Sequence, residues 1–354
     1  MNRHLLDLFA GGFDRRPLAV RPYLVAEAGV NHEGSLDVAR RLIDEAAAGG
    51  ADAIKFQTYK AGSLAVRDSP AYWDLSQEAT TSQYELFRRF DAFGPPEYEA
   101  LKEHCDTVGI AFMSTPFDAE AARFLNDLVD VHKISSSDLT NRPLIELVAS
   151  FGKPILLSTG ASDLHEIRRA VRWITDAGAP LALLHCVLNY PTAEADAALG
   201  RIVGLRQAFP DHVIGYSDHT LPADLEALVV AAGLGAVVIE KHFTHDRRLP
   251  GNDHYHALDQ ATLRRLVERL ERAVELVGRF DLDHLEGEAL SRRHARRSVV
   301  TASALPAGTR LEPHHLTWKR PGHGISPADM DQVIGRRLKR DLPADTTLTW
   351  DDLV

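Results

Sequence analysis

The sequence contains little cysteine: Cys105 and Cys186 are the only two thiols in 354 residues. So few thiols exclude a disulfide framework, and we expect a chain that works in the reducing cytoplasm. Cys186 ends an apolar run and is expected to pack as a small hydrophobic side chain. Cys105 falls within a predicted helix.

An excess of positive charge and long apolar runs are also missing. The net charge is −10, from 40 Lys and Arg against 50 Asp and Glu, which argues against a nucleic-acid partner. The basic stretch 291–298 has no interleaved aromatic residues and indicates a solvated linker. No run of 18 apolar residues occurs, and residues 1–20 lack the apolar region of a secretory signal, so we expect neither a membrane span nor export.

Eight short apolar runs are present instead, and each ends near a polar or charged residue. Helical patterns separate most of them, which predicts consecutive βα units and an α/β fold, a closed (β/α)8 barrel of the TIM type. The predicted strands are 23–29, 51–58, 109–115, 131–136, 154–159, 181–186, 212–217 and 236–241.

Changes in pattern along the chain divide it into four parts. We predict an N-terminal extension over 1–20, a catalytic barrel over 21–280, a linker over 281–297 and a small β-rich domain over 298–354. Ser35 is the expected N-cap of the first helix, which stops at Gly49-Gly50. The predicted later helices are 97–108, 118–129, 142–151, 163–177, 197–208, 222–233 and 259–278. The long connection 59–108 is a candidate specificity loop.

Two histidines lie at the ends of the last two predicted strands. His219 follows the seventh strand, His242 follows the eighth, and Glu27 lies on the first. Adjacent strand ends of a barrel bring side chains together, so the pair predicts a divalent metal site beside a carboxylate. Imidazole, carboxylate and water suit Mn, Fe, Co or Zn. The alternative is that each histidine only caps a helix or satisfies a buried polar group.

Two lysines, Lys55 and Lys133, lie on predicted strands and require an anion or an ionic partner if they point inward. Hydroxyl groups at neighbouring strand ends could join them in a phosphate or carboxylate pocket: Thr115, Ser136, Ser158 and Ser217. Each hydroxyl alone could equally cap the helix that follows. A metal, a carboxylate and a cationic pocket together suit carbon–carbon bond formation between an aldehyde and an enol phosphate. The metal would act as Lewis acid on the aldehyde, and Glu27 would act as general base or position the water for the later step.

The motifs YLVAEAGVNHEGSLDVA, KFQTY, STPFD, KISSSDLTNRPLI, FGKPILLSTG, FPDHVIGYSDHT, IEKHFTHD and PGND resemble those of the sialic acid (N-acetylneuraminate) synthase family. LTWKRPGHGIS resembles the antifreeze-like (SAF) domain of the same family. The resemblance covers about residues 20–354. It implies condensation of phosphoenolpyruvate with an N-acetylhexosamine such as N-acetylmannosamine, giving a 3-deoxy-nonulosonic acid and phosphate. A divalent metal is implied as cofactor, Mn2+ first, with Mg2+ or Co2+ as alternatives.

The resemblance also implies roles for individual residues. His219 and His242 would bind the metal, Glu27 would be the catalytic carboxylate, and the two lysines and four hydroxyl residues named above would hold phosphoenolpyruvate. The acceptor sugar would contact Asp138, Tyr190, Asp253 and Arg320. In the family the arginine comes from the other subunit, so a domain-swapped homodimer is implied.

Two positions depart from the family pattern, both in the acceptor half of the site. Leu188 stands where asparagine is common, and Asp138 stands where glutamate is frequent, so the identity of the sugar stays open. One rival is an aldolase that uses Lys133 or Lys241 as a Schiff base with pyruvate, or a metal aldolase. The other is a carbohydrate-binding protein without catalysis.

Overall fold

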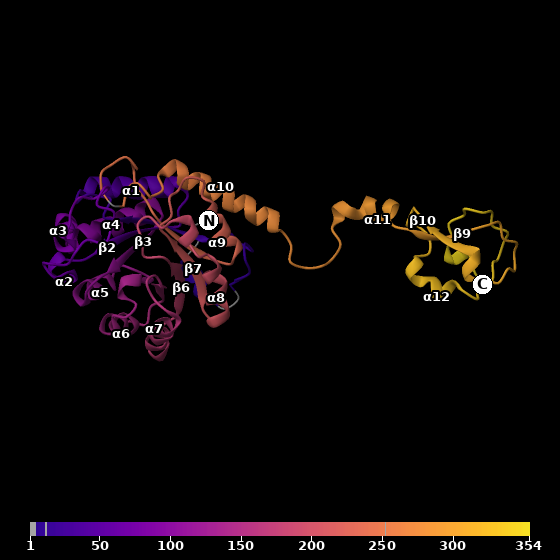
Figure 1. Cartoon of the computed structure of the whole chain (residues 1–354), viewed down its shortest axis with the longest axis horizontal. Helices are drawn as coiled ribbons and strands as arrows, with labels where there is room; N and C mark the ends of the chain where they lie inside the picture. The colour runs from indigo at the N-terminus through magenta and orange to yellow at the C-terminus, as the bar shows by residue number, and fades with distance from the viewer. Residues whose placement is uncertain (1–4, 11–12, 252) are drawn as a thin grey trace. The chain divides into compact units, whose positions relative to one another are not determined.

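The computed structural model describes residues 5–10, 13–251 and 253–354 (Figure 1). Residues 1–4 and 11–12 of the predicted extension, and Asn252 of the PGND motif, lie outside the described residues. The chain forms two compact units, residues 1–278 and 279–354. No helix within the described ranges is long and apolar enough to cross a membrane.

The first unit is built on eight parallel strands in the order β3-β2-β1-β8-β7-β6-β5-β4, with β3 and β4 also neighbours. This is the predicted TIM barrel. The strands are β1 (Tyr23–Gly29), β2 (Ala53–Thr58), β3 (Ala111–Pro116), β4 (His132–Ile134), β5 (Ile155–Ser158), β6 (Leu181–Cys186), β7 (Val213–Asp218) and β8 (Val238–His242). Each lies within a few residues of its predicted range, and the first and last strands pair in register.

Helices cover the outside of the strands (Figure 1). They are α1 (Leu36–Gly49), α4 (Pro95–Val108), α5 (Ala119–Leu125), α6 (Arg142–Ala149), α7 (Leu164–Asp176), α8 (Gly200–Ala208), α9 (Glu226–Gly233) and α10 (Gln260–Val277). The Ser35 side chain accepts from the Val38 backbone N–H, and Gly50 ends α1 with φ 93°, so both predicted signals are confirmed. The predicted helix 118–129 was too long, because α5 ends at Leu125.

The long connection after β2 is more ordered than a loop. It contains two helices that the sequence analysis did not predict, α2 (Ala61–Leu64) and α3 (Gln83–Phe90), before α4 begins. The two prolines, Pro95 and Pro96, occupy the first turn of α4, where a missing backbone N–H costs little.

Alternating side chains of the strands supply two separate apolar cores. Side chains such as Leu24, Ile54 and Ile239 face the helices. Val25, Met113 and other side chains near the N-terminal ends of the strands fill the lower barrel interior. Leu5 and Leu8, from the short 3-10 helix Leu5–Phe9, join this inner core and close the lower end of the barrel.

The second unit contains α11 (Ala289–Ala295), an antiparallel pair formed by β9 (Ser298–Thr301) and β10 (Leu316–Lys319), and α12 (Met330–Val333). Its own core is formed by residues that include Val299, Leu311 and Leu348. Residues 281–297 were predicted to be a linker, yet they contain a helix. The Gly322 backbone N–H donates to the carbonyl oxygen of Arg293, so α11 contacts the β-rich part of the same unit.

Candidate active site

Every strand of the barrel contributes one polar side chain to a ring near its C-terminal end. Because side chains on a strand alternate, residues two positions after the inner apolar layer also point inward. The ring consists of Glu27, Lys55, Thr115, Lys133, Ser158, Cys186, Ser217 and Glu240. The structure therefore brings together the predicted carboxylate, both predicted lysines and three of the predicted hydroxyls.

The register of the first strands explains why Glu27 lies next to Lys55. Glu27 is paired with Lys55 on one side and with His242 on the other. The Lys55 ammonium lies 2.5 Å from Glu27 Oε2, and it also donates to Thr115 Oγ1 at 3.1 Å. Gln57, two residues further along β2, donates from Nε2 to the second oxygen of Glu27 at 2.9 Å.

Glu240 is the main member of the ring that the sequence analysis missed. Its carboxylate lies 3.8 Å from the Lys55 ammonium and 3.9 Å from that of Lys133, and it accepts from Ser217 Oγ at 2.9 Å. Lys133 itself donates to Ser158 Oγ at 2.8 Å. The period-two spacing Val238, Glu240, His242 would have revealed this inward position. Two lysines and two carboxylates are thus buried side by side.

Burial changes the protonation of these carboxylates in opposite directions. Burial raises the pKa of Glu27 to about 7, with Lys55 opposing the shift and Glu240 adding to it. Burial also acts to raise the pKa of Glu240, but Lys133 and Lys55 overcome it and lower the pKa. Glu27 therefore has the pKa of a group that can exchange a proton near neutral pH, whereas Glu240 stays ionised.

The two predicted metal ligands lie at the rim of this ring, their ring centroids 5.5 Å apart. His219 is hydrogen bonded through Nδ1 to the carbonyl oxygen of Val187 at 2.8 Å, which leaves Nε2 as its available nitrogen. Burial lowers the pKa of His219 to about 4 and that of His242 well below its usual value, so both rings are neutral near pH 7, as metal ligation requires.

The donor set fits a metal ion with open coordination positions. His242 Nδ1 is buried without a hydrogen-bond partner, which is unusual for a polar atom unless a ligand or a moving neighbour satisfies it. Within the described residues, no three His, Cys, Asp or Glu side chains are placed to hold one ion. The chain thus offers two imidazoles, and substrate and water would complete the coordination sphere.

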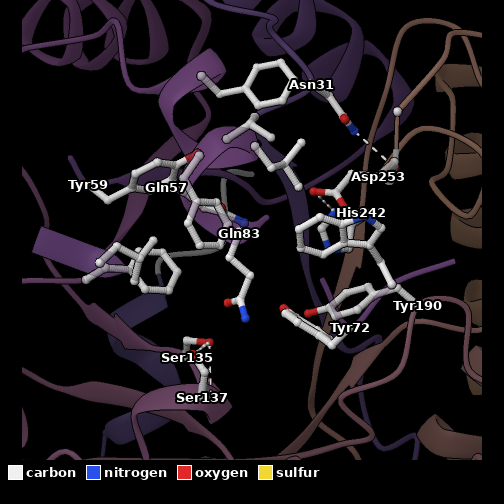
Figure 2. A pocket seen from close by; sticks show the side chains of 18 of the residues that line it. Asn31, Gln57, Tyr59, Tyr72, Gln83, Ser135, Ser137, Tyr190, His242 and Asp253 are labelled. Atoms are coloured by element: carbon white, nitrogen blue, oxygen red, sulfur yellow. Dashed lines mark hydrogen bonds and ion pairs between the residues drawn. The ribbon is translucent and has the colours of Figure 1, made fainter. Parts of the chain in front are cut away.

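Above the ring, the cavity widens into a second part of about 440 Å3. The two parts share Gln57, Phe117, Ser135, Tyr190 and His242 as lining residues. The upper part is lined by residues of the 59–108 connection, which include Tyr59, Tyr72, Trp73 and Phe87. Figure 2 shows Tyr59, Tyr72 and Gln83 around the opening. The predicted specificity loop therefore forms much of the wall of the cavity.

The remaining predicted residues fall in three places. Asp138, Tyr190 and Asp253 line the upper part of the cavity, as does Leu188. Ser136 lies in the lower part with the ring hydroxyls. Arg320 is an exposed residue of the second unit, directly after β10.

Two expectations about other side chains need correction. Cys186 does not simply pack as a hydrophobic residue, because its Sγ lines the lower cavity, 3.9 Å from Ser136 Oγ and from His219 Nδ1. Burial raises the pKa of the Cys186 thiol to about 11, so it stays protonated. Lys241, a rival Schiff-base lysine, points away from the cavity and pairs with Asp218 at 2.7 Å.

Two family models match the chain. The model of the NeuB family matches residues 42–281, and that of the SAF domain matches residues 296–354. The chain is 36% identical to the N,N'-diacetyllegionaminic acid synthase of Legionella pneumophila, over 97% of each chain.

Solved structures give the same result. A crystal structure of the N-acetylneuraminic acid synthetase of Leptospira borgpetersenii matches with a TM-score of 0.68 at 35% identity, over 77% of this chain and 90% of that one. The spore coat polysaccharide biosynthesis protein spsE of Bacillus subtilis matches with a TM-score of 0.62 at 32% identity, over 95% and 96%. The chain is therefore an enzyme of the NeuB family that carries an SAF domain at its C-terminal end.

Proposed function

We propose that the chain condenses phosphoenolpyruvate with an N-acetylhexosamine, or a related amino-sugar aldehyde, to give a 3-deoxy-nonulosonic acid and phosphate. The observation that carries this proposal is the ring of eight polar side chains, in which two buried lysines lie beside Glu27 and below the two histidines. The relatives from Legionella and Leptospira, named as an N,N'-diacetyllegionaminic acid synthase and an N-acetylneuraminic acid (sialic acid) synthetase, support the same reaction class.

The lower part of the cavity suits phosphoenolpyruvate because the two lysine side chains that line it are already oriented. Lys55 and Lys133 are held by Thr115 and Ser158, so their ammonium groups need little rearrangement to meet the phosphate and carboxylate groups of the substrate. Ser136 and Ser217 add hydroxyl donors. As phosphate leaves with cleavage of its C–O bond, the same ammonium groups stabilise the charge that it carries away.

Glu27 is placed to act on water. Its carboxylate is fixed by Gln57 and Lys55 and lies in register with His242, next to the proposed metal site. With a pKa near 7, it can accept the proton of the water that adds to C2 of the enol phosphate. His219 and His242 would hold a divalent metal, Mn2+ first, which would polarise the aldehyde carbonyl of the acceptor.

The upper cavity favours an acceptor that carries apolar groups. Leu188 takes the place of a polar residue, and it lines the same cavity as Tyr72, Trp73, Leu86 and Phe87. Methyl groups of N-acetyl substituents bury well against such a surface. Asp138, Tyr190 and Asp253 offer a few polar contacts in the same wall. A sugar with one or two acetamido groups is therefore the proposed acceptor.

The assembly that we propose is a domain-swapped homodimer. It rests on the family resemblance, in which the arginine at the position of Arg320 contacts the acceptor of the other subunit. Arg320, which precedes Pro321, is exposed within its own unit, so that unit does not block its side chain from an acceptor sugar. Cross-complementation tests this: a mixture of Arg320→Ala and His242→Ala chains should regain activity that neither homodimer has.

The reaction is tested by incubating the protein with Mn2+, phosphoenolpyruvate and a panel of hexoses and N-acetylated hexosamines, with phosphate release as the readout. We expect release only with acetamido sugars, and loss of release in His219→Ala and His242→Ala. His185→Ala is the matched control, because His185 is equally buried on β6 but bonds to the carbonyl oxygen of Ala197 outside the cavity. Phosphate release without any metal would contradict the metal assignment.

The aldolase rival is separated by a second assay. Lys133 is the only one of its two candidate lysines that reaches the cavity. Borohydride trapping with pyruvate should therefore leave the protein unlabelled, and labelling of Lys133 would favour the aldolase.

A further inference from the structure

His256 is a buried histidine without an assigned role. Its side chain is fully buried, and neither ring nitrogen has a hydrogen-bond partner. Leaving such groups unpaired costs about 1–3 kcal/mol each, so an imidazole in this position calls for an explanation. An apolar side chain of similar volume would fill the same space without that cost.

Apart from Tyr255, which precedes it in the chain, the aromatic rings that contact His256 belong to the proposed active site. Its ring centroid lies 4.8 Å from that of His242, 5.6 Å from that of Tyr190 and 6.3 Å from that of His219. Its Nε2 lies 3.8 Å from Asp253 Oδ1. No other carboxylate is recorded in ionic contact with it among the described residues.

Asp253 lies between two imidazoles. Its Oδ2 is 3.9 Å from His242 Nδ1, a contact drawn in Figure 2, and its Oδ1 faces His256 at almost the same distance. Asn31 Nδ2 donates to the backbone carbonyl of Asp253 and anchors this segment. The two oxygens of its side chain thus face two different rings, one each.

We propose that His256 is a positioning residue of the metal site. Its Nε2–H donates to Asp253, and Asp253 in turn accepts from Nδ1–H of His242, so that Nε2 of His242 carries its lone pair toward the metal. This inference rests on the proposed function, since it concerns the same metal. Outer partners of this kind fix the tautomer and orientation of a ligating histidine.

The present distances are longer than hydrogen bonds and shorten by small movements. A shift of the Asp253 carboxylate toward one ring, and of the rings toward it, by about 1 Å makes both contacts. Contacts that act in catalysis are often long in the ligand-free enzyme and tighten when the site fills. The orphaned Nδ1 of His242 and Nε2 of His256 are then satisfied together.

Direct ligation by His256 is the alternative, and the cavity argues against it. Two imidazoles on one ion have ring centroids at most about 6.4 Å apart, given metal–nitrogen distances of about 2.1 Å. The three centroid distances satisfy this limit. However, His219 and His242 line the cavity and His256 does not, and its Nε2 faces Asp253 rather than the space where an ion and substrates would meet.

The test is the Mn2+ affinity of the substrate-free protein, measured by the EPR signal of unbound Mn2+. His256→Phe keeps the volume and removes both nitrogens; we expect affinity to fall about 10- to 100-fold, the usual effect of losing an outer partner. His256→Gln restores one N–H donor and should recover part of the loss. The double variant Asp253→Asn/His256→Phe should bind Mn2+ as tightly as Asp253→Asn alone, because both changes interrupt the same chain of contacts.

Each result separates the possibilities. His212→Phe, a half-buried histidine against Phe209, is the control for loss of an imidazole elsewhere. Unchanged Mn2+ affinity in His256→Phe, with an active parent enzyme, overturns this inference and leaves the proposed function standing. Three coordinated imidazoles in pulsed EPR of the parent would make His256 a ligand and also overturn it. A parent protein that binds no Mn2+ overturns the inference and the metal assignment together. If His256→Phe fails to fold, His256→Gln and Asp253→Asn carry the test.

Discussion

Glu240 gives the sharpest test of the buried charge arrangement. The change Glu240→Gln keeps the shape of the side chain and an acceptor for Ser217, but it removes the negative charge between Lys55 and Lys133. At separations near 4 Å, each of these two ion pairs has an attraction of about 4 kcal/mol at an effective dielectric constant of about 20.

The expected loss of stability is large. Removing one partner of a buried pair typically costs about 3–5 kcal/mol, because the remaining charge is left desolvated. For a domain of this size, that loss lowers Tm by roughly 6–20 °C. The measurement is thermal unfolding at pH 8. This pH lies above the pKa of Glu27, about 7, so Glu27 is ionised in the parent as it is in the variant.

Phosphoenolpyruvate should reverse part of the effect. Its phosphate and carboxylate groups supply the negative charge that Glu240→Gln has lost, so the ligand should raise Tm more in the variant than in the parent. Glu226→Gln is the matched control: its partner Arg269 is at 2.9 Å on the surface, where a pair contributes about 0–1 kcal/mol. Equal melting temperatures for the two variants would refute the reasoning.

Three further outcomes are expected. Because Glu27 accepts a proton only when ionised, kcat/KM of the parent should fall as pH drops below about 7. Glu27→Gln should lower kcat/KM and remove this pH dependence. A parent profile that is flat between pH 6 and 8 would contradict the role of Glu27 as base. Leu188→Asn should shift kcat/KM by about 10-fold toward more hydroxylated acceptors without changing the KM for phosphoenolpyruvate, and a change in that KM would place Leu188 in the wrong half of the cavity. Lys241→Met should cost about 3–5 kcal/mol in urea unfolding by leaving Asp218 buried and unpaired, while the KM for phosphoenolpyruvate in the folded fraction stays unchanged.

The barrel and its inner ring were largely accessible from the sequence, for a physical reason. A buried parallel strand repeats every two residues and is apolar on both faces, so the polar exceptions at strand ends are conspicuous. Glu27, Lys55 and Lys133 stand out in this way, and all three lie in the ring. Glu240 could have been predicted in the same way, because it lies two residues after Val238 and two before His242 on the same strand. It was missed because Lys241 and His242, the next two residues, were the ones considered as site residues.

Features that depend on loops were not accessible. Helices α2 and α3 have only four and eight residues, too few for a repeating apolar pattern to identify them, even though Ser82 caps α3 and Leu86, Phe87 and Phe90 share one of its faces. His256 lies in a segment without strand or helix, and only the folded chain brings it to Asp253 and His242. The helix α11 was missed because its charged, exposed sequence resembles a linker.

The lower closure of the barrel has a consequence for how the molecule is made. Leu5 and Leu8 leave the ribosome before any of the strands, yet their place exists only once Val237 and Val238 have joined the others. The inner core that Leu5 and Leu8 complete therefore cannot be finished until the last strand has joined the sheet.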